Sequence, residues 1–183
     1  MAKSIITPLS CEVIKNLKAG DDVLLSGVIY TARDAAHERM VNDYKNTGHF
    51  PIELSGQAVY YAGPCPAKPG EVIGSCGPTS AGRMDAYTPL LLNCGLSAMI
   101  GKGSRSQEVT DAIIKNKCVY LGAIGGAGAL IAKAIKSSEV VCYDDLGTEA
   151  IRKLVVENLP LVVLTDCDGN DLYKIGRNKF SKI

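Results

Sequence analysis

The spacing of hydrophobic positions changes several times along the chain, and each change marks a predicted element. Residues 23–30 form an apolar, β-branched run that predicts a strand. Apolar side chains between positions 36 and 44 recur at helical spacing, which predicts a helix ending at about Asn46. Asp34 or Thr31 is expected to cap the start of this helix.

The middle of the chain is rich in turns and contains shorter elements. Short strands are predicted at 52–54, 58–62 and 71–74. Thr88-Pro89 is typical of a helix start, and Gly95 of a helix end. Ser104 with Gln107 resembles a capping box, which predicts a further helix at about 106–116.

From Cys118 onward the pattern predicts a βαβαβ arrangement. The predicted strands are 119–121, 140–143 and 161–164, with helices from the 125–128 glycine segment to about Lys136 and at about 147–156, and a last extended piece at 171–173. Near-continuous apolar strands between helices favour a parallel sheet covered on both faces, so the fold class is α/β. No repeat, linker or low-complexity segment interrupts the chain, which predicts one domain over residues 1–183.

Composition and charge exclude several classes of function. A net charge of +1 with scattered basic residues argues against nucleic acid or an anionic membrane as a partner. The absence of Trp and the presence of only two Phe leave little for base stacking. No apolar run approaches the roughly 18 residues of a membrane span, and the N-terminus lacks the apolar segment of a signal peptide.

The seven cysteines are scattered and odd in number, and only two histidines are present. Reduced cysteines in apolar surroundings behave as small hydrophobic residues, so a reducing cytoplasm is the expected location. Because no clustered Cys or His spacing occurs, no metal site is expected on this chain by itself.

The stretch from Cys76 to Gly103 holds the strongest candidate chemistry. It combines the hydroxyls of Thr79 and Ser80 with the cations Arg83 and Lys102, among glycines that leave room for a ligand near the backbone. If the segment from Thr79 is helical, Thr79 and Arg83 share a face, and a guanidinium there can bind both oxygens of a carboxylate. We therefore expect a carboxylate or phosphate site, with a simple turn into a helix as the alternative.

Other motifs have structural explanations beside functional ones. Arg33-Asp34 is either part of a site or a surface ion pair, and His37 is more often a helix-face residue than a base. The glycines at 122–128 have the wrong spacing for dinucleotide binding and favour a close strand-to-helix turn. Asp166 to Gly169 lacks the full calcium-loop pattern, so a hairpin turn is expected there.

Five segments, in order, resemble signature segments of class I (iron–sulfur) fumarases. They are Tyr-Thr-Ala-Arg-Asp-Ala-Ala-His (30–37), Gly-Pro-Thr-Ser-Ala-Gly-Arg-Met-Asp (77–85), Met-Ile-Gly-Lys-Gly (99–103), Gly-Gly-Ala-Gly-Ala-Leu (125–130) and Gly-Asn-Asp-Leu-Tyr (169–173). The likeness is to the C-terminal domain, or to the separate β subunit where the enzyme is split, and L(+)-tartrate dehydratase β subunits share it. It extends from about residue 5 to 173, with Ser80 where many relatives have Thr.

The resemblance implies an architecture and partners. The architecture is a three-layer swivelling β/β/α domain, akin to the mobile domain of aconitase-like enzymes. A [4Fe-4S] cluster is implied in a partner α subunit or N-terminal domain, with none bound by this chain alone. A dimer of αβ units is the implied assembly.

The resemblance also implies roles for individual residues. Arg33, Arg83 and Lys102 hold substrate carboxylates, and Thr79 corresponds to the catalytic base, with Ser80 and His37 as further substrate-site residues. The implied reaction is reversible hydration of fumarate to L-malate, active only with the α subunit. Alternatives are the tartrate dehydratase β subunit, acting on tartrate, and a non-catalytic dicarboxylate-binding domain; fumarate, tartrate and mesaconate are not distinguished by sequence.

Overall fold

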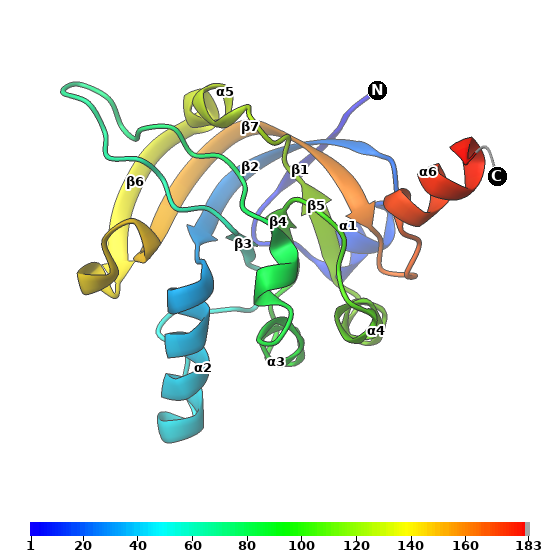
Figure 1. Cartoon of the computed structure of the whole chain (residues 1–183), viewed down its shortest axis with the longest axis horizontal. Coiled ribbons are helices and arrows are strands. Elements are labelled where there is room, and N and C mark those ends of the chain that lie inside the picture. The colour runs from blue at the N-terminus through cyan, green and yellow to red at the C-terminus, as the bar shows by residue number, and fades with distance from the viewer. Residues whose placement is uncertain (182–183) are drawn as a thin grey trace.

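The computed structural model describes residues 1–181 and is a mixed α/β structure built on seven strands (Figure 1). The sheet order is β1-β2-β3-β4-β5-β7-β6, with an additional pairing between β2 and β7. The strands are β1 (Lys3–Ile6), β2 (Asp22–Thr31), β3 (Ala58–Tyr60), β4 (Ala98–Gly101), β5 (Val119–Gly122), β6 (Ile135–Cys142) and β7 (Ile151–Thr165). The helices are α1 (Cys11–Lys15), α2 (Asp34–Thr47), α3 (Thr88–Asn93), α4 (Gln107–Asn116), α5 (Gly128–Ala134) and α6 (Leu172–Phe180), with 3₁₀ helices η1 (Ala81–Met84) and η2 (Asp144–Glu149).

Strand β7 closes the sheet on itself. Strands β1 to β5 are mutually parallel, whereas β7 runs antiparallel to β2, β5 and β6. Because β7 pairs with β2 along one side and with β5 on the other, β2, β3, β4, β5 and β7 form a closed ring. Figure 1 shows β6, β7 and β2 arching above the shorter central strands.

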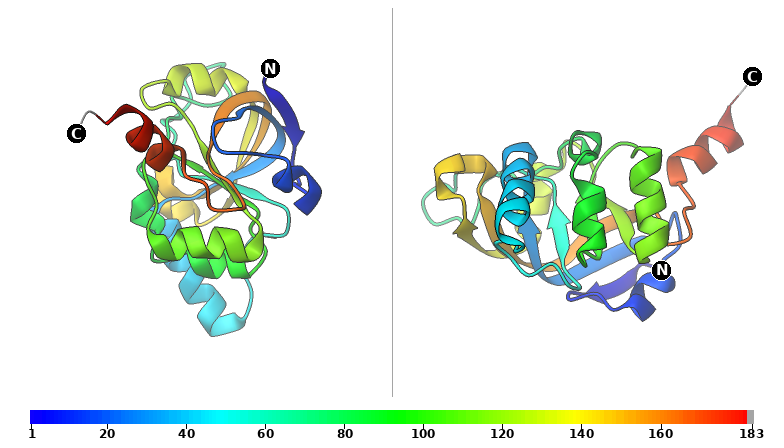
Figure 2. Two further views of the ribbon diagram at one scale, coloured as in Figure 1. Left: turned by 90° about the vertical axis from the view of Figure 1, so that its right-hand side faces the viewer. Right: turned by 90° about the horizontal axis from the view of Figure 1, so that it is seen from below.

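Two apolar cores lie on opposite faces of the central strands. Residues of β3, β4 and β5 alternate between the cores, because successive side chains of a strand point to opposite faces. Ala58 and Tyr60 belong to the core inside the ring, together with residues of β2, β7 and α5. Val59 and Tyr61 belong to the second core, which includes residues of α2, α3 and α4. These three helices cover the lower side of the sheet in Figure 1 and are seen from below in Figure 2.

Several predicted helices are confirmed, but the residues at their cap positions differ from those predicted. Helix α2 ends one residue after the predicted Asn46, but its cap position is Arg33 and no side chain caps it. Helix α4 matches the predicted 106–116, but Ser106 caps it by accepting a hydrogen bond from the Val109 N–H (3.3 Å), so the predicted Ser104 capping box is wrong. Of the three short strands predicted between 52 and 74, only 58–60 forms. Helix α1 was not predicted.

The predicted C-terminal βαβαβ unit is wrong. Residues 147–156 form no α-helix, because 147–149 belong to η2 and the segment 151–165 is one long strand, antiparallel to β6. Within the predicted helix, Ile151 and Leu154 are both buried although they are three residues apart, because they lie in different cores. That spacing imitates a helical period in the sequence. The last extended piece, 171–173, is the start of α6, capped by Asp171.

Among residues 1–181, no helix has both the length and the apolar character to cross a membrane.

Candidate functional site

The parallel strands bring the predicted site residues to one edge of the sheet. Arg33 lies two residues beyond β2, and Lys102 directly follows β4. Thr79 is held at the end of β3, because its N–H donates to the carbonyl of Tyr61 (2.7 Å). In open parallel sheets, ligands bind at the carboxyl ends of strands, and these three residues lie at such ends.

Thr79 and Ser80 precede a 3₁₀ helix rather than opening an α-helix. Ser80 has an extended backbone and forms an isolated parallel bridge with Lys102, and the Ala81 N–H donates to the Lys102 carbonyl (2.9 Å). The expected helical face shared by Thr79 and Arg83 therefore does not exist. Instead, the turn of η1 places Arg83 beside the strand ends, with its side chain 53% exposed.

Arg33 and Arg83 are joined by a carboxylate that sequence analysis treated as a cap. Asp34 Oδ1 lies 2.8 Å from Arg83 Nε, and its Oδ2 lies 3.6 Å from Arg33 Nη2. Glu149 approaches Arg33 Nη2 at 3.4 Å and accepts a hydrogen bond from the Ala35 N–H (3.0 Å). The Arg33-Asp34 ion pair anticipated as an alternative thus exists, within a four-residue network that holds both arginines.

The guanidinium of Arg33 is not saturated by these contacts. Its Nε is buried and has no hydrogen-bond partner within residues 1–181. Gly63 makes room for it, because a Cβ at that position would lie 3.0 Å from Arg33 Nη1. A buried donor without a partner is costly unless a ligand or water supplies the acceptor. This atom is therefore a candidate donor to an oxygen-bearing ligand or to a water molecule.

Lys102 is exposed and forms no ion pair with any described acidic residue. Its side chain runs along Gly125, where a Cβ would lie 3.6 Å from Lys102 Cδ. Gly103 has φ of +85°, a conformation that favours glycine. Gly101 serves packing rather than ligand access, since a Cβ there would lie 2.9 Å from the Tyr61 ring.

His37 is buried beneath the site. Its Nδ1 lies 2.9 Å from the carbonyl of Arg33, so this nitrogen carries the proton, and Nε2 has no partner among the described residues. Burial, with a smaller contribution from the charge of Arg105, lowers the pKa of His37 to about 4, although the hydrogen bond to the Arg33 carbonyl opposes this shift. The ring is neutral at pH 7 and has no exposed surface, so its predicted substrate contact stays a prediction.

Sequence analysis missed two groups around this edge. Glu149 comes from η2, more than a hundred residues from Arg33, and no local pattern signals their meeting. Arg105 and Asp85 form a buried pair (2.7 Å) below the strand ends, and only the position of Asp85 at the end of a signature segment could have drawn attention to it.

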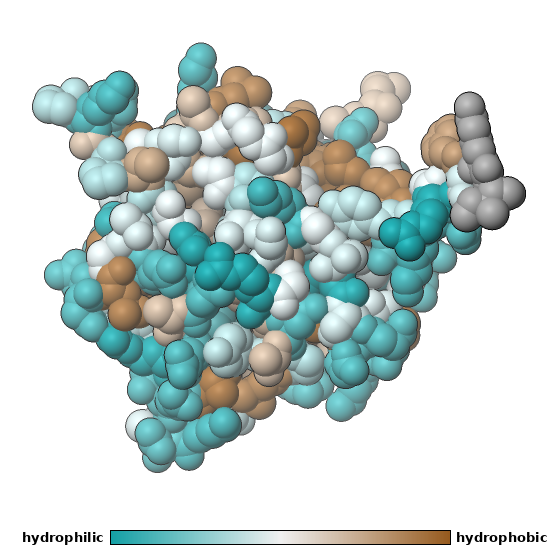
Figure 3. All heavy atoms as spheres, viewed as in Figure 1, coloured by the Kyte–Doolittle hydropathy of each residue, from teal (hydrophilic) through white to brown (hydrophobic). Residues whose placement is uncertain are grey.

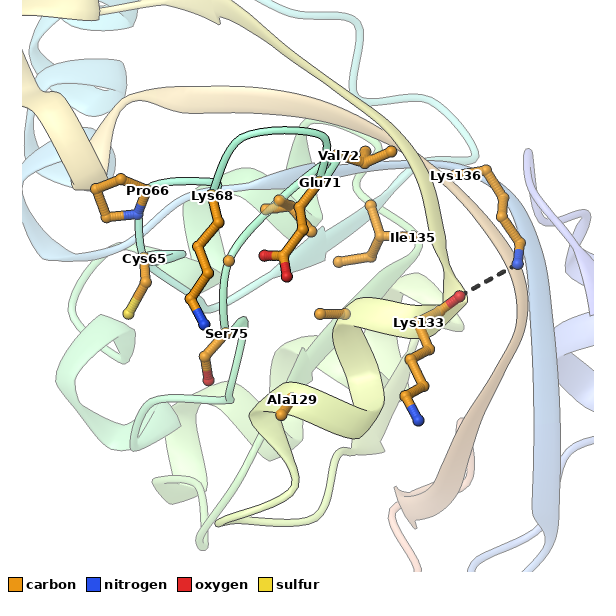
Figure 4. Close-up of a pocket in the computed structure, with 13 residues that line it drawn as sticks. Cys65, Pro66, Lys68, Glu71, Val72, Ser75, Ala129, Lys133, Ile135 and Lys136 are labelled. Atoms are coloured by element: carbon orange, nitrogen blue, oxygen red, sulfur yellow. Dashed lines mark hydrogen bonds between the residues drawn. The ribbon is translucent and has the colours of Figure 1, made fainter.

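The described cavities lie away from these residues. The largest, about 730 Å³, lies between the 65–75 loop and the α5–β6 segment, and Figure 4 shows Lys68 and Glu71 within it. Neither this cavity nor two others of about 590 Å³ include Arg33, Thr79, Arg83 or Lys102. Figure 3 shows hydrophilic side chains spread over the face seen in Figure 1. The site is therefore an open edge that needs a second surface to enclose a substrate.

The described part of the chain holds no group of three or more His, Cys, Asp or Glu side chains arranged to bind a metal ion. All seven cysteines are free. A cluster with thiolate ligands does not fit these residues.

Comparison with known proteins identifies relatives over most of the chain. The family model described as "Fumarase C-terminus" matches residues 4–176. "Fumarate hydratase class I, aerobic" of Escherichia coli is 45% identical over 152 residues, 82% of this chain and 28% of that protein. "Fumarate hydratase 2" of Leishmania major is 41% identical over 84% of this chain and 28% of that protein.

A relative of similar length is also found. "Putative L(+)-tartrate dehydratase subunit beta" of Methanocaldococcus jannaschii is 37% identical over 177 residues, 93% of this chain and 91% of that protein. The chain thus spans under a third of the fumarate hydratases it matches, but nearly the whole of this subunit. From the match over residues 4–176, the chain belongs to the fumarase C-terminus family.

Proposed function

We propose that this chain is the β subunit of a class I iron–sulfur hydro-lyase that reversibly hydrates fumarate to L-malate. The observation that carries the proposal is the buried Nε of Arg33, which has no partner within residues 1–181 and lies at the same edge of the sheet as Arg83 and Lys102. Three cations around one open edge suit a dianionic substrate with two carboxylates, because guanidinium groups bind carboxylate oxygens in pairs. Membership of the fumarase C-terminus family supports the same reaction.

We further propose that residues 1–183 form a single swivelling β/β/α domain. The ring of strands closed by β7, with α2, α3 and α4 on one side, supports a three-layer arrangement of antiparallel strands, parallel strands and helices. Such a domain would close its exposed strand ends over a substrate bound to a second domain.

The partner is proposed to be an α subunit that carries a [4Fe-4S] cluster, in a dimer of αβ units. Support comes from the open site edge, from the poor fit of this chain's residues to cluster ligation, and from relatives about three times as long. The seven free cysteines support a reducing compartment, for which the cytoplasm is the proposed location.

In this proposal the chain's own residues bind the substrate and move one proton. Arg33, Arg83 and Lys102 orient the two carboxylates, each charge-assisted bond contributing roughly 1.5–3 kcal/mol. Thr79, half-buried, has its backbone fixed by Tyr61, which directs its hydroxyl from a rigid strand end. In the dehydration direction this hydroxyl takes the proton from the carbon next to a carboxylate, and it returns the proton during hydration.

A free threonine hydroxyl is a weak base, so it needs nearby cations and the exclusion of water. Arg83 and Lys102 lie beside Thr79 in the chain's fold and supply the positive charge. Exclusion of water requires the partner surface, because the site edge is open. The chain alone is therefore expected to be inactive.

The test is co-production with a candidate α subunit under anaerobic conditions, followed by assay of malate, tartrate and mesaconate in parallel. Turnover of malate by the complex, and none by either chain alone, is the expected result. A complex that forms and turns over none of the three substrates would contradict the enzymatic proposal and leave a non-catalytic dicarboxylate-binding domain, to be tested by titrating the isolated chain with succinate.

The second candidate is the β subunit of an L(+)-tartrate dehydratase, which converts tartrate to oxaloacetate. It is favoured by the relative from Methanocaldococcus jannaschii, of which this chain covers 91%. The same arginine and lysine side chains would bind the carboxylates of tartrate. Preferential turnover of tartrate in the parallel assay would select this candidate.

A further inference from the structure

Arg105 is a buried cation directly beneath the candidate site. Its side chain is 1% exposed, and its Nε donates to Asp85 Oδ1 (2.7 Å). Its Nη2 donates to the hydroxyl of Thr88 (2.8 Å). The guanidinium carbon lies 5.4 Å from the centroid of the Tyr61 ring and 5.0 Å from that of the Tyr120 ring. The planar cation is therefore held between two aromatic rings and a carboxylate.

Three partners of Arg105, namely Tyr61, Asp85 and Tyr120, support segments that hold the site residues. The carbonyl of Tyr61 accepts the hydrogen bond from the Thr79 N–H. Asp85 directly follows η1, the turn that holds Arg83, and its N–H donates to the Gly82 carbonyl (3.3 Å).

The third connection runs to the loop of Lys102. The hydroxyl of Tyr120 donates to the carbonyl of Gly103 (3.0 Å), the residue after Lys102. Asp85 Oδ2 also accepts from the Ser106 N–H (2.7 Å), which fixes the end of the same loop. One buried guanidinium thus contacts the supports of the proposed base and of two proposed carboxylate ligands.

A buried ion pair is weak evidence for a stabilising role, because the free-energy cost of removing two charges from water offsets much of the energy of their attraction. A methionine in place of Arg105 would fill the space between the rings without this desolvation cost. What methionine cannot supply is the fork of directed N–H groups that joins Asp85, Thr88 and the two rings. The geometry of the pair therefore points to placement of the site rather than to stability of the fold.

We infer that Arg105 and Asp85 form a positioning pair that fixes Thr79, Arg83 and Lys102 relative to one another. The inference rests on the proposed function for its kinetic consequence, but its structural consequence is independent of any activity. Loss of the pair loosens the segments 79–84 and 101–106 and leaves the opposite edge of the sheet unchanged.

The experiment compares Arg105→Met, Arg105→Lys and the double variant Arg105→Met/Asp85→Asn, which leaves no unpaired buried charge. The matched control is Lys3→Gln, which removes a cation that pairs with Asp21 Oδ2 (2.6 Å) at the opposite end of the parallel strands. For each, kcat and KM are measured in the assembled enzyme, with the thermal midpoint Tm. Hydrogen exchange of the backbone amides is measured on the isolated full chain.

The expected result is a Tm within a few degrees of wild type for the double variant Arg105→Met/Asp85→Asn and a lower Tm for Arg105→Met, which leaves Asp85 unpaired. In both variants kcat/KM should fall at least tenfold, through a higher KM and a lower kcat. Arg105→Lys should recover part of the loss. The amides of Thr79 and Ala81 should exchange faster in the methionine variants, and those of β1 should not change. Lys3→Gln should match wild type in kinetics and in exchange at residues 79–84.

Wild-type kcat and KM in Arg105→Met, or a loss of activity that simply follows Tm across the variants, would overturn the inference. If the methionine variants do not fold, the Arg105→Lys variant tests the inference by itself. Wild-type kinetics and wild-type amide exchange in that variant would overturn the inference. If the wild-type complex turns over no substrate, the proposed function fails. The exchange rates of Thr79 and Ala81 then decide the positioning role on their own.

Discussion

Thr79 is the residue on which the proposed chemistry depends most. Replacing it with alanine removes the only atom proposed to accept the substrate proton, so turnover in the assembled enzyme should fall about 10²- to 10⁴-fold. The KM should change little, because the carboxylates are bound by Arg33, Arg83 and Lys102. Steady-state kinetics with malate measures both quantities.

Two neighbouring variants serve as controls. Thr79→Ser keeps a hydroxyl at the same backbone position and should retain most of the turnover. Ser80→Ala removes the adjacent, exposed hydroxyl and separates its predicted substrate contact from the role of Thr79. Near wild-type turnover in Thr79→Ala would reject this residue as the base.

Burial of His37 makes the stability of the chain depend on pH. The folded-state pKa is about 4, below the ordinary value of 6.5, so between these values only the unfolded chain binds the proton. The free energy of unfolding should therefore fall as pH decreases from 6.5 to 4, by about 3 kcal/mol from this residue. Urea unfolding at several pH values measures the slope.

The matched variant pair for this prediction uses the chain's two histidines. His37→Gln should remove most of the slope between pH 6.5 and 4, whatever its effect on stability at pH 7. His49→Gln alters the exposed histidine and should keep the wild-type slope. An unchanged slope in His37→Gln would show that the buried ring does not resist protonation.

At this scale, the structure tests the placement of the candidate residues, and their chemical roles stay predictions. Arg33, Thr79 and Lys102 do meet at one sheet edge, because each is tied to the end of a parallel strand. The helical face expected for Thr79 and Arg83 does not form. Glu149 could not have been found, since its approach to Arg33 depends on the path of β7 rather than on local spacing.

At the scale of elements, β7 shows why periodicity alone misled the prediction for the C-terminal third. Within the predicted helix 147–156, Ile151 and Leu154 are buried in different cores, and their separation of three residues imitates a helical period. The prediction of helix α2 succeeded because an uninterrupted helix keeps its period. A strand that is buried on both faces loses the two-residue alternation of apolar side chains, so hydrophobic spacing alone does not distinguish it from a helix.

A left-handed residue within β7 gives a stability prediction, since Asn158 has φ of +51°. Asn158→Val places a β-branched residue in the left-handed region, which should lower the free energy of unfolding by about 1–2 kcal/mol. Because Asn158 is exposed, the change removes no core contact. Asn158→Gly tolerates this conformation and should stay close to wild type in denaturant unfolding. Equal stability of the valine and glycine variants would contradict the role assigned to this backbone conformation.

At the scale of the whole molecule, the two cores cannot come apart without breaking shared strands. Each of β3, β4 and β5 sends alternate residues into the core inside the ring and into the core beneath the helices. If either core is lost, one face of these shared strands is exposed to water, and the strands no longer support the core on their opposite face. The structure therefore predicts that both cores unfold in one cooperative transition.

Two native thiols report on the two cores separately. Cys76 lies in the core inside the ring and Cys118 in the core beneath the helices, and burial raises the pKa of both thiols to about 12. Neither should react with a short pulse of iodoacetamide until its core opens, because the thiolate is the reactive form. Mass spectrometry of samples pulsed across a urea gradient should give one midpoint for both cysteines, while exposed Cys11 and Cys65 react throughout. If Cys118 became reactive at a clearly lower urea concentration than Cys76, the helical layer would unfold independently and the strands would not couple the two cores.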